Sequence, residues 1–246
     1  PRVKYGILGD VHANLSALRA VLDRFKTHRV DRILSVGDVV GYGAAPSECI
    51  AILRELGARV VKGNHDAACV NEMDLAYFNA YARTAVTWTR TQLSREDCTW
   101  LARLPLTLDL EDCSVAHGTY HRPERFDYVQ GESDAEASLD RLPTPVCFVG
   151  HSHVPIALVR LEDDPLRTAR AEGSDFDLAE VHRALINVGS VGQPRDDDPR
   201  AAYGIFDVEE QRVVIERVRY DIEVEARRIR AAGLPPVLAD RLYHGV

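Results

Sequence analysis

The amino-acid sequence predicts a layered α/β fold, in which helices cover a β-sheet. In the first quarter of the chain, short apolar runs alternate with longer runs whose apolar residues repeat at helical spacing, and this alternation is typical of βαβ units. The 246 residues include 46% hydrophobic and 28% charged side chains, the balance of a globular protein rather than of a disordered or fibrous one. A chain of this length can bury a sizeable core.

The first part of the chain is expected to form strands and helices in alternation. From Asn14 to about His28, apolar residues recur at helical spacing and predict an amphipathic helix. Pro46 suits the first position of a helix and Gly57 is a frequent stop, so a second helix is expected between them. Buried strands are expected around these helices, at Val3–Leu8, Arg32–Val36 and Arg59–Lys62.

The rest of the chain is expected to continue this mixture, as one domain over residues 1–246. Leu75–Leu104 predicts two helices separated near Ser94, which suits the position that caps the second. Glu162–Asp177 is polar, contains a proline and a glycine, and is expected to be a surface loop. The apolar stretch Leu234–Leu242 leaves packing on the core and packing on another subunit both open. The other expected elements are strands at Leu106–Leu110, Ser114–Ala116, Val146–Val149, Ile156–Leu161, Leu185–Val188, Ala201–Val208 and Arg212–Tyr220, and helices at Ser133–Leu142 and Asp221–Ala232.

Charge and cysteine usage narrow the class of protein. The formal net charge of −8 indicates an acidic chain without an obvious basic track for nucleic acid. No apolar run approaches the roughly 20 residues needed to span a bilayer, so no membrane partner is expected. The five cysteines are odd in number and none are spaced as CxxC, and Pro1–Tyr5 shows no signal-peptide pattern. We therefore expect reduced thiols and a cytoplasmic location.

Acidic, histidine, asparagine and glycine residues concentrate directly after predicted strands. The carboxyl ends of strands in a layered α/β protein form its usual binding crevice, and glycine allows the sharp turns that bring such side chains together. Five of the nine histidines lie in these segments. The segments are Gly9-Asp10-Val11-His12, Gly37-Asp38, Gly63-Asn64-His65-Asp66, His117-Gly118 and Gly150-His151-Ser152-His153.

These residue types predict a metal site. Carboxylate, imidazole and amide oxygen ligands suit divalent ions such as Mn, Fe, Zn, Co or Ni. They are more numerous than one ion needs, and a shared carboxylate is a natural bridge between two ions about 3.5–4 Å apart. Taken singly, Asp10 could cap the following helix and Asn64 could be a turn residue. Five such segments in order favour metal binding over these explanations.

The ordered set D-x-H, GD, GNHD, HG and GHSH resembles the calcineurin-like metallophosphoesterase superfamily, with a match from Gly9 to His153. The resemblance implies a four-layer α/β/β/α sandwich, in which two mixed sheets pack face to face and helices lie outside. It also implies two divalent metal ions with Asp38 as their bridge, and it identifies His65 as the histidine that faces the substrate and as the candidate general acid. The remaining ligands implied are Asp10, His12 and His153 for the first ion, and Asn64, His117 and His151 for the second.

Together these parts imply hydrolysis of a phosphate ester or anhydride. Water held between two ions loses a proton near neutral pH and attacks phosphorus in line with the leaving oxygen, and His65 stabilises or protonates that oxygen. We expect the substrate to be a phosphodiester, a phosphomonoester or a nucleotide anhydride, with small nucleotides favoured over long nucleic acids. Two alternatives are a non-catalytic protein-binding scaffold, which the complete set of ligands disfavours, and a nuclease, which would need a basic track.

One segment departs from the Ser/Thr protein phosphatase branch of this family. Where that branch supplies a further Asp and an Arg, this chain has Gly41 and Tyr42. The difference counts against a protein phosphatase, and it leaves the neighbouring Asp66 as a candidate partner for His65.

Two other segments, Gly41-Tyr42-Gly43 and Asn187–Arg195, resemble a small bacterial and archaeal branch. Its members are described as phosphodiesterases or diadenosine tetraphosphate hydrolases. Arg195 would contact phosphate, because a guanidinium fork matches phosphate oxygens; a solvated turn with local ion pairs is the alternative. The weaker candidates for substrate contact are Tyr42, His121 and Arg122.

Overall fold

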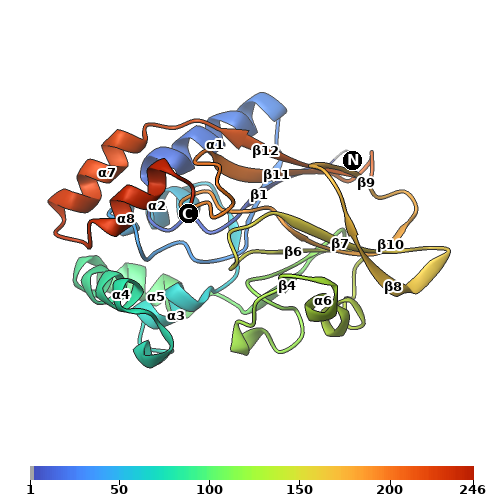
Figure 1. Cartoon of the computed structure of the whole chain (residues 1–246), viewed down its shortest axis with the longest axis horizontal. Helices are drawn as coiled ribbons and strands as arrows, with labels where there is room; N and C mark the ends of the chain where they lie inside the picture. Colours follow the sequence, from blue (N-terminus) through green and yellow to red (C-terminus); the bar gives the residue numbers. More distant parts are fainter. Residues whose placement is uncertain (1–2) are drawn as a thin grey trace.

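Two six-stranded sheets form the centre of the molecule in the computed structural model, which describes residues 3–246 (Figure 1). The first sheet has the strand order β3 (Arg59–Val60), β2 (Arg32–Ser35), β1 (Lys4–Leu8), β11 (Ala201–Asp207), β12 (Arg212–Val218) and β9 (Asp175–Asp177). The second has the order β4 (Thr107–Asp109), β5 (Ser114–Ala116), β6 (Val146–Val149), β10 (Val181–Asn187), β7 (Ile156–Leu161) and β8 (Asp164–Ala171). Both sheets mix parallel and antiparallel pairs.

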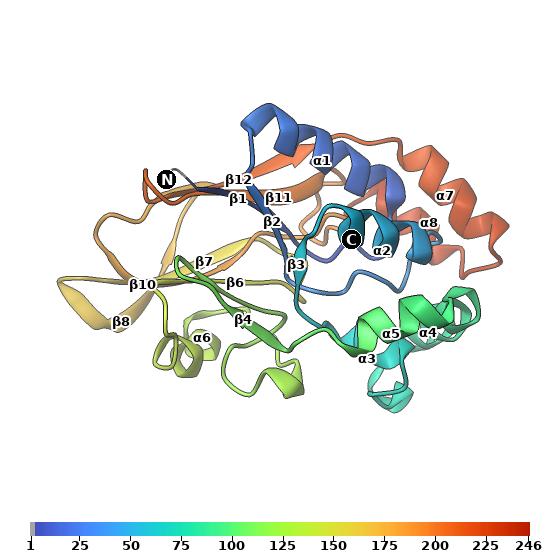
Figure 2. The same ribbon diagram turned by 180° about the vertical axis from the view of Figure 1, so that it is seen from behind.

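Helices cover the outer faces of both sheets. The described part of the chain contains eight α-helices, which are α1 (Leu15–His28), α2 (Pro46–Glu55), α3 (Asn64–Cys69), α4 (Ala80–Gln92), α5 (Arg95–Ala102), α6 (Glu132–Leu139), α7 (Ile222–Ala231) and α8 (Val237–Asp240). Helices α1, α2, α7 and α8 lie on the side of the first sheet, and α6 lies under the second (Figure 1). Figure 2 shows α3, α4 and α5 grouped together at one end of the molecule. The four-layer α/β/β/α arrangement is therefore confirmed.

Strand alternation explains how three apolar clusters hold these layers together. On β1, Tyr5 and Ile7 belong to the cluster between the two sheets, whereas Leu8 belongs to the cluster under α1 and α2, as expected when successive side chains point to opposite faces. Gly6 faces the helix layer, where a Cβ would come within 2.6 Å of Phe25. A side chain at position 6 would therefore require the Phe25 ring to shift away from the sheet. A third cluster joins the second sheet to α6.

Most predicted elements are present, and two differ. Ser94 caps α5, since its Oγ accepts a hydrogen bond from the backbone of Asp97 at 3.0 Å. Glu162–Asp177 is not a loop, because it contains β8 and β9. Both are edge strands, and β8 is largely exposed, so it needs no apolar alternation and its polar sequence resembles that of a loop. The short helix α3, which begins at Asn64, is not among the elements predicted from the sequence.

The C-terminal stretch Leu234–Leu242 packs on the chain's own core. Leu234, Leu238 and Leu242 are buried in the cluster beneath α1 and α7.

All five cysteines are free thiols, as predicted, and four of them are buried. Within residues 3–246, no helix has the length and apolar character to cross a membrane.

Candidate metal centre

The carboxyl ends of five strands bring all seven predicted metal ligands together. Strands β1, β2 and β3 run parallel in one sheet and β5 and β6 run parallel in the other, so their ends meet at the same side of the sandwich. The acid and histidine ligands form two buried groups that share Asp38, with ligand atoms within 4.8 Å of one another. One group is Asp10, His12, Asp38 and His153, and the other is Asp38, His117 and His151.

In the first group, two imidazoles point the same nitrogen inward. The Nε2 atoms of His12 and His153 lie 3.1 Å apart, and they lie 3.6 Å from carboxylate oxygens of Asp38 and Asp10 respectively. The outer Nδ1 atoms contact backbone carbonyls, of Val40 at 3.0 Å for His12 and of Gln193 at 2.7 Å for His153. A carbonyl can only accept, so each Nδ1 carries the proton, and the inward Nε2 keeps its lone pair for a metal.

The second group is built in the same way around His117. Its Nδ1 donates to the backbone oxygen of Val36 at 2.8 Å. Its Nε2 lies 3.0 Å from Oδ1 of Asn64, 3.2 Å from Nδ1 of His151 and 3.3 Å from Oδ2 of Asp38. The amide oxygen of Asn64 is thus a member of the second group, as the GNHD motif predicts.

When all the imidazoles are neutral, the atoms that face one another in this site are hydrogen-bond acceptors with no donor between them. Asp38 Oδ2 is fully buried and accepts no hydrogen bond from the described residues, although it lies 3.6 Å from His12 Nε2 and 3.3 Å from His117 Nε2. Buried acceptors in this arrangement are stabilised by positive charge between them, from a metal cation or, without metal, from a proton on His117. Two groups sharing one carboxylate therefore fit two divalent ions with Asp38 as the bridge.

The pKa values of the site follow from its burial and its two carboxylates. Burial lowers the pKa of His12 and His153 well below the usual range, and that of His151 to about 3, so these imidazoles are neutral, as metal binding requires. Burial raises the pKa of Asp10 to about 7. Burial opposes ionisation of Asp38 as well, but the nearby His117 and His65 outweigh it and lower that pKa.

His117 has the opposite shift. Burial acts to lower its pKa, but the charge of Asp38, whose Oδ2 lies 3.3 Å from His117 Nε2, raises it to about 9. Without metal, a proton on His117 is thus the main charge available to balance the buried carboxylates. A bound cation would take over that role.

Backbone strain is concentrated at the ligands. His12, Asp38, His151 and His153 all have φ between 47° and 71°, a region that costs a non-glycine residue about 1–3 kcal/mol. Four of the seven predicted ligands therefore adopt a conformation that the fold must impose. Gly63 permits this crowding, because a Cβ there would lie 2.0 Å from Oδ1 of Asp38.

The imidazole of His65 is positioned by packing rather than by an acidic partner. It is buried and lies against the rings of Tyr42, His12 and Phe78, at centroid distances of 4.5, 4.8 and 5.0 Å. Its Nδ1 has no hydrogen-bond partner within residues 3–246. Asp66 accepts instead from the backbone of Val40 at 3.2 Å and of Gly63 at 3.0 Å, so the structure does not support Asp66 as the partner of His65.

Glycine at position 41 makes room for this histidine. A Cβ on Gly41 would lie 2.4 Å from His65 Nδ1, and Gly41 has a φ of +88°. Protein phosphatases have an aspartate at this position. Here the absence of a side chain on Gly41 leaves space for the imidazole of His65.

Arg195 and Tyr42 lie beside the metal ligands. The Arg195 Nη2 donates to Gln193 Oε1 at 2.8 Å and to the Tyr42 hydroxyl at 3.4 Å, and the Tyr42 ring is 4.7 Å from that of His12. Among the acids that follow Arg195, Asp196 pairs with Arg217 and Asp198 pairs with Arg200.

Within residues 3–246, no hydrogen bond, ion pair or ring contact connects His121 or Arg122 to the predicted metal ligands. The side chains that act on the His121 imidazole are Arg141, Arg122, Glu124 and Arg125, none of which belongs to the metal groups. Sequence reasoning missed Tyr128, whose half-exposed ring stacks on His151 at 3.9 Å and 16°. No motif contains Tyr128, so only the fold reveals its place.

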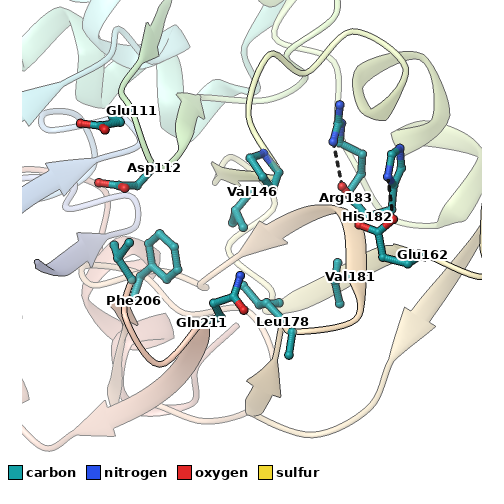
Figure 3. Close-up of a pocket in the computed structure, with 13 residues that line it drawn as sticks. Glu111, Asp112, Val146, Glu162, Leu178, Val181, His182, Arg183, Phe206 and Gln211 are labelled. Carbon is teal, nitrogen blue, oxygen red and sulfur yellow. Dashed lines mark hydrogen bonds and ion pairs between the residues drawn. The ribbon is translucent and has the colours of Figure 1, made fainter. Parts of the chain in front are cut away.

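A separate cavity of about 340 Å³ lies at the other end of the sandwich (Figure 3). Its walls include Val146 at the start of β6 and Val181 at the start of β10, whereas the metal ligands follow the ends of parallel strands. His182 pairs with Glu162 beside it at 3.4 Å. The cavity shares no residue with the metal centre and contributes nothing to its chemistry.

One family model and several proteins of known sequence or structure are similar to this chain. A model of the calcineurin-like phosphoesterase superfamily domain matches residues 3–211. An uncharacterised protein of Methanocaldococcus jannaschii is 37% identical over 245 residues, covering 97% of each chain. The crystal structure of a metallophosphoesterase from Sphaerobacter thermophilus is 41% identical, with a TM-score of 0.87 over 100% of both chains. A hypothetical protein from Pyrococcus horikoshii shares the fold at 19% identity, with a TM-score of 0.79 over 99% of both chains.

Proposed function

The chain belongs to the calcineurin-like phosphoesterase superfamily, and from this premise we propose that it is a hydrolase that cleaves a small phosphate ester or anhydride with two divalent metal ions. The observation that carries the proposal is the pair of buried ligand groups that share Asp38. A shared carboxylate is the arrangement that two-metal phosphoesterases need, because both ions must act on one phosphoryl group.

Each ligand has a definite role in this proposal. Asp38 would hold both ions. When bound, the ions supply a water of lowered pKa and positive charge close to the phosphoryl oxygens. The remaining ligands would be Asp10, His12 and His153 for one ion, and Asn64, His117 and His151 for the other.

His65 would act on the leaving oxygen. Burial lowers the pKa of its imidazole to about 4, so the ring is neutral at pH 7 and carries a single N–H. A neutral imidazole of this kind stabilises the leaving oxygen chiefly by donating a hydrogen bond. Its packing against Tyr42 and Phe78 limits the movement of the ring before the substrate arrives.

Two further residues would recognise the substrate. Arg195 would bind phosphoryl oxygens through its guanidinium group. Tyr128 presents a half-exposed ring next to His151, which suits a planar organic group such as a nucleobase, since aromatic rings and bases stack favourably. A small nucleotide is therefore the substrate we favour.

Hydrolysis assays with three substrates test this function. Purified protein loaded with Mn is expected to hydrolyse bis(p-nitrophenyl) phosphate, and diadenosine tetraphosphate more efficiently. Turnover of the aryl ester alone would contradict the choice of a nucleotide. Preferential cleavage of single-stranded DNA would indicate a nuclease. Absence of turnover on all three, in protein shown to hold metal, would contradict the enzyme and favour a protein-binding scaffold.

A further inference from the structure

Two arginines from distant parts of the chain meet at one buried amide oxygen. Gln193 Oε1 accepts from Arg195 Nη2 at 2.8 Å and lies 3.4 Å from Arg241 Nη1, a second donor. Gln193 is only 2% exposed. Arg241 begins the short turn Arg241–Tyr243 that follows α8, so the C-terminal segment brings the second guanidinium to the first.

No acidic side chain of residues 3–246 forms an ion pair with either of these cations. Arg241 Nε donates to the oxygen of Val246 at 2.6 Å, whereas Arg200, in the same loop as Arg195, pairs with the Asp198 carboxylate. Burial lowers the pKa of the Arg241 guanidinium, and the positive charge of Arg195 adds to this effect. Two guanidinium charges held this close repel each other, and an anion bound between them would relieve that repulsion.

The pair lies directly beside the metal centre. The Arg195 guanidinium carbon is 5.7 Å from the centroid of the Tyr42 ring, and this ring contacts His12 and His65. Gln193 links the two sites through its backbone oxygen, which accepts from His153 Nδ1 at 2.7 Å. An anion between the arginines would therefore be a near neighbour of a phosphoryl group at the metals.

We infer that Arg195 and Arg241 form a second phosphoryl-binding site, so that the preferred substrate carries another phosphoryl group next to the one that is cleaved. The inference rests on the proposed function, and it narrows the substrate to a phosphoanhydride chain. The superfamily model ends at residue 211, so Arg241 lies in the C-terminal part of the chain that this general model does not match.

Calorimetric binding to the metal-loaded protein tests the inference without requiring turnover. The probes are methylenediphosphonate, which has two phosphoryl groups and resists hydrolysis, and methylphosphonate, which has one. Wild-type protein is expected to bind the diphosphonate more tightly. Arg241→Gln is expected to weaken that binding about 10- to 100-fold, the usual effect of losing a charge-assisted contact to an anion, and to change methylphosphonate binding by less than about threefold.

Two control variants show whether Arg241→Gln weakens diphosphonate binding directly or by disturbing the structure nearby. Arg241→Lys keeps the charge and is expected to restore part of the diphosphonate affinity. Arg200→Gln removes a neighbouring arginine that already has a carboxylate partner, and it is expected to bind both probes as wild type does. Equal affinity of wild type for the two probes would overturn the inference, as would an equal loss of both in Arg241→Gln. Failure of the proposed function would appear separately, as wild-type protein that binds diphosphonate and hydrolyses no substrate.

Discussion

Replacing Gly41 with alanine tests whether His65 acts from the position that packing gives it. The added Cβ would lie 2.4 Å from His65 Nδ1, and ordinary contact begins at 3.4 Å, so the imidazole must retreat by about 1 Å. A displacement of about 1 Å at a catalytic group can reduce the rate about 100-fold. We therefore expect kcat for bis(p-nitrophenyl) phosphate to fall about 100-fold while the protein keeps its metal.

Gly57 provides a matched control for the backbone effect. It also has a positive φ, of +63°, but a Cβ there would meet no atom within 4 Å. Alanine in this left-handed conformation costs about 1–2 kcal/mol at either position, which corresponds to a decrease in Tm of about 2–8 °C in a chain of this size. Gly57→Ala is thus expected to be less stable and fully active.

The assay compares steady-state rates, Tm and metal content for both variants and for His65→Gln. Because Gly41 and His65 act through one contact, adding Gly41→Ala to His65→Gln is expected to reduce the rate little further. A Gly41→Ala protein with kcat within about threefold of wild type would refute the steric reasoning. So would an equal loss of activity in Gly57→Ala, or a loss of metal that accounts for the rate.

Three further predictions concern the metal centre. Asp38→Ala is expected to lower the metal content and to reduce kcat by orders of magnitude, measured by elemental analysis and hydrolysis; full activity would contradict the bridging role. Asn187→Leu removes the amide that donates to Gly150 O at 2.7 Å and Ser152 Oγ at 2.9 Å, and chelator competition should show metal affinity reduced about 10- to 100-fold. Removing the ions with a chelator is expected to lower Tm, because ions present at 1,000 times their Kd contribute about 4 kcal/mol to the folded state. An unchanged Tm in calorimetry would argue against buried ions.

The clustering of the seven candidate ligands could be predicted because each follows the end of a strand within a short motif. The strands are apolar and short, so their ends can be located, and parallel strands place those ends at one side of the fold. A strand was missed where its side chains are mostly exposed to solvent. In β8, exposed on most of its length, the polar sequence gives no alternation from which to predict a strand.

Contacts between distant segments could not be predicted in the same way. Arg241 is 48 residues from Gln193, and neither belongs to a pattern that indicates an arginine pair. Tyr128 reaches His151 by the path of the loop before α6, not by spacing. His65 is a third case, since the sequence suggested a carboxylate partner in Asp66 and the structure shows a glycine and a cage of rings instead.

The central claim is that two metal ions shared by Asp38 carry out phosphoester hydrolysis. Elemental analysis of the purified protein, paired with hydrolysis of bis(p-nitrophenyl) phosphate with and without added Mn, tests it most directly. The structure predicts about two metal ions per chain and turnover that disappears when they are removed. A chain that binds no metal after reconstitution, or that hydrolyses the ester equally well without metal, would contradict the claim.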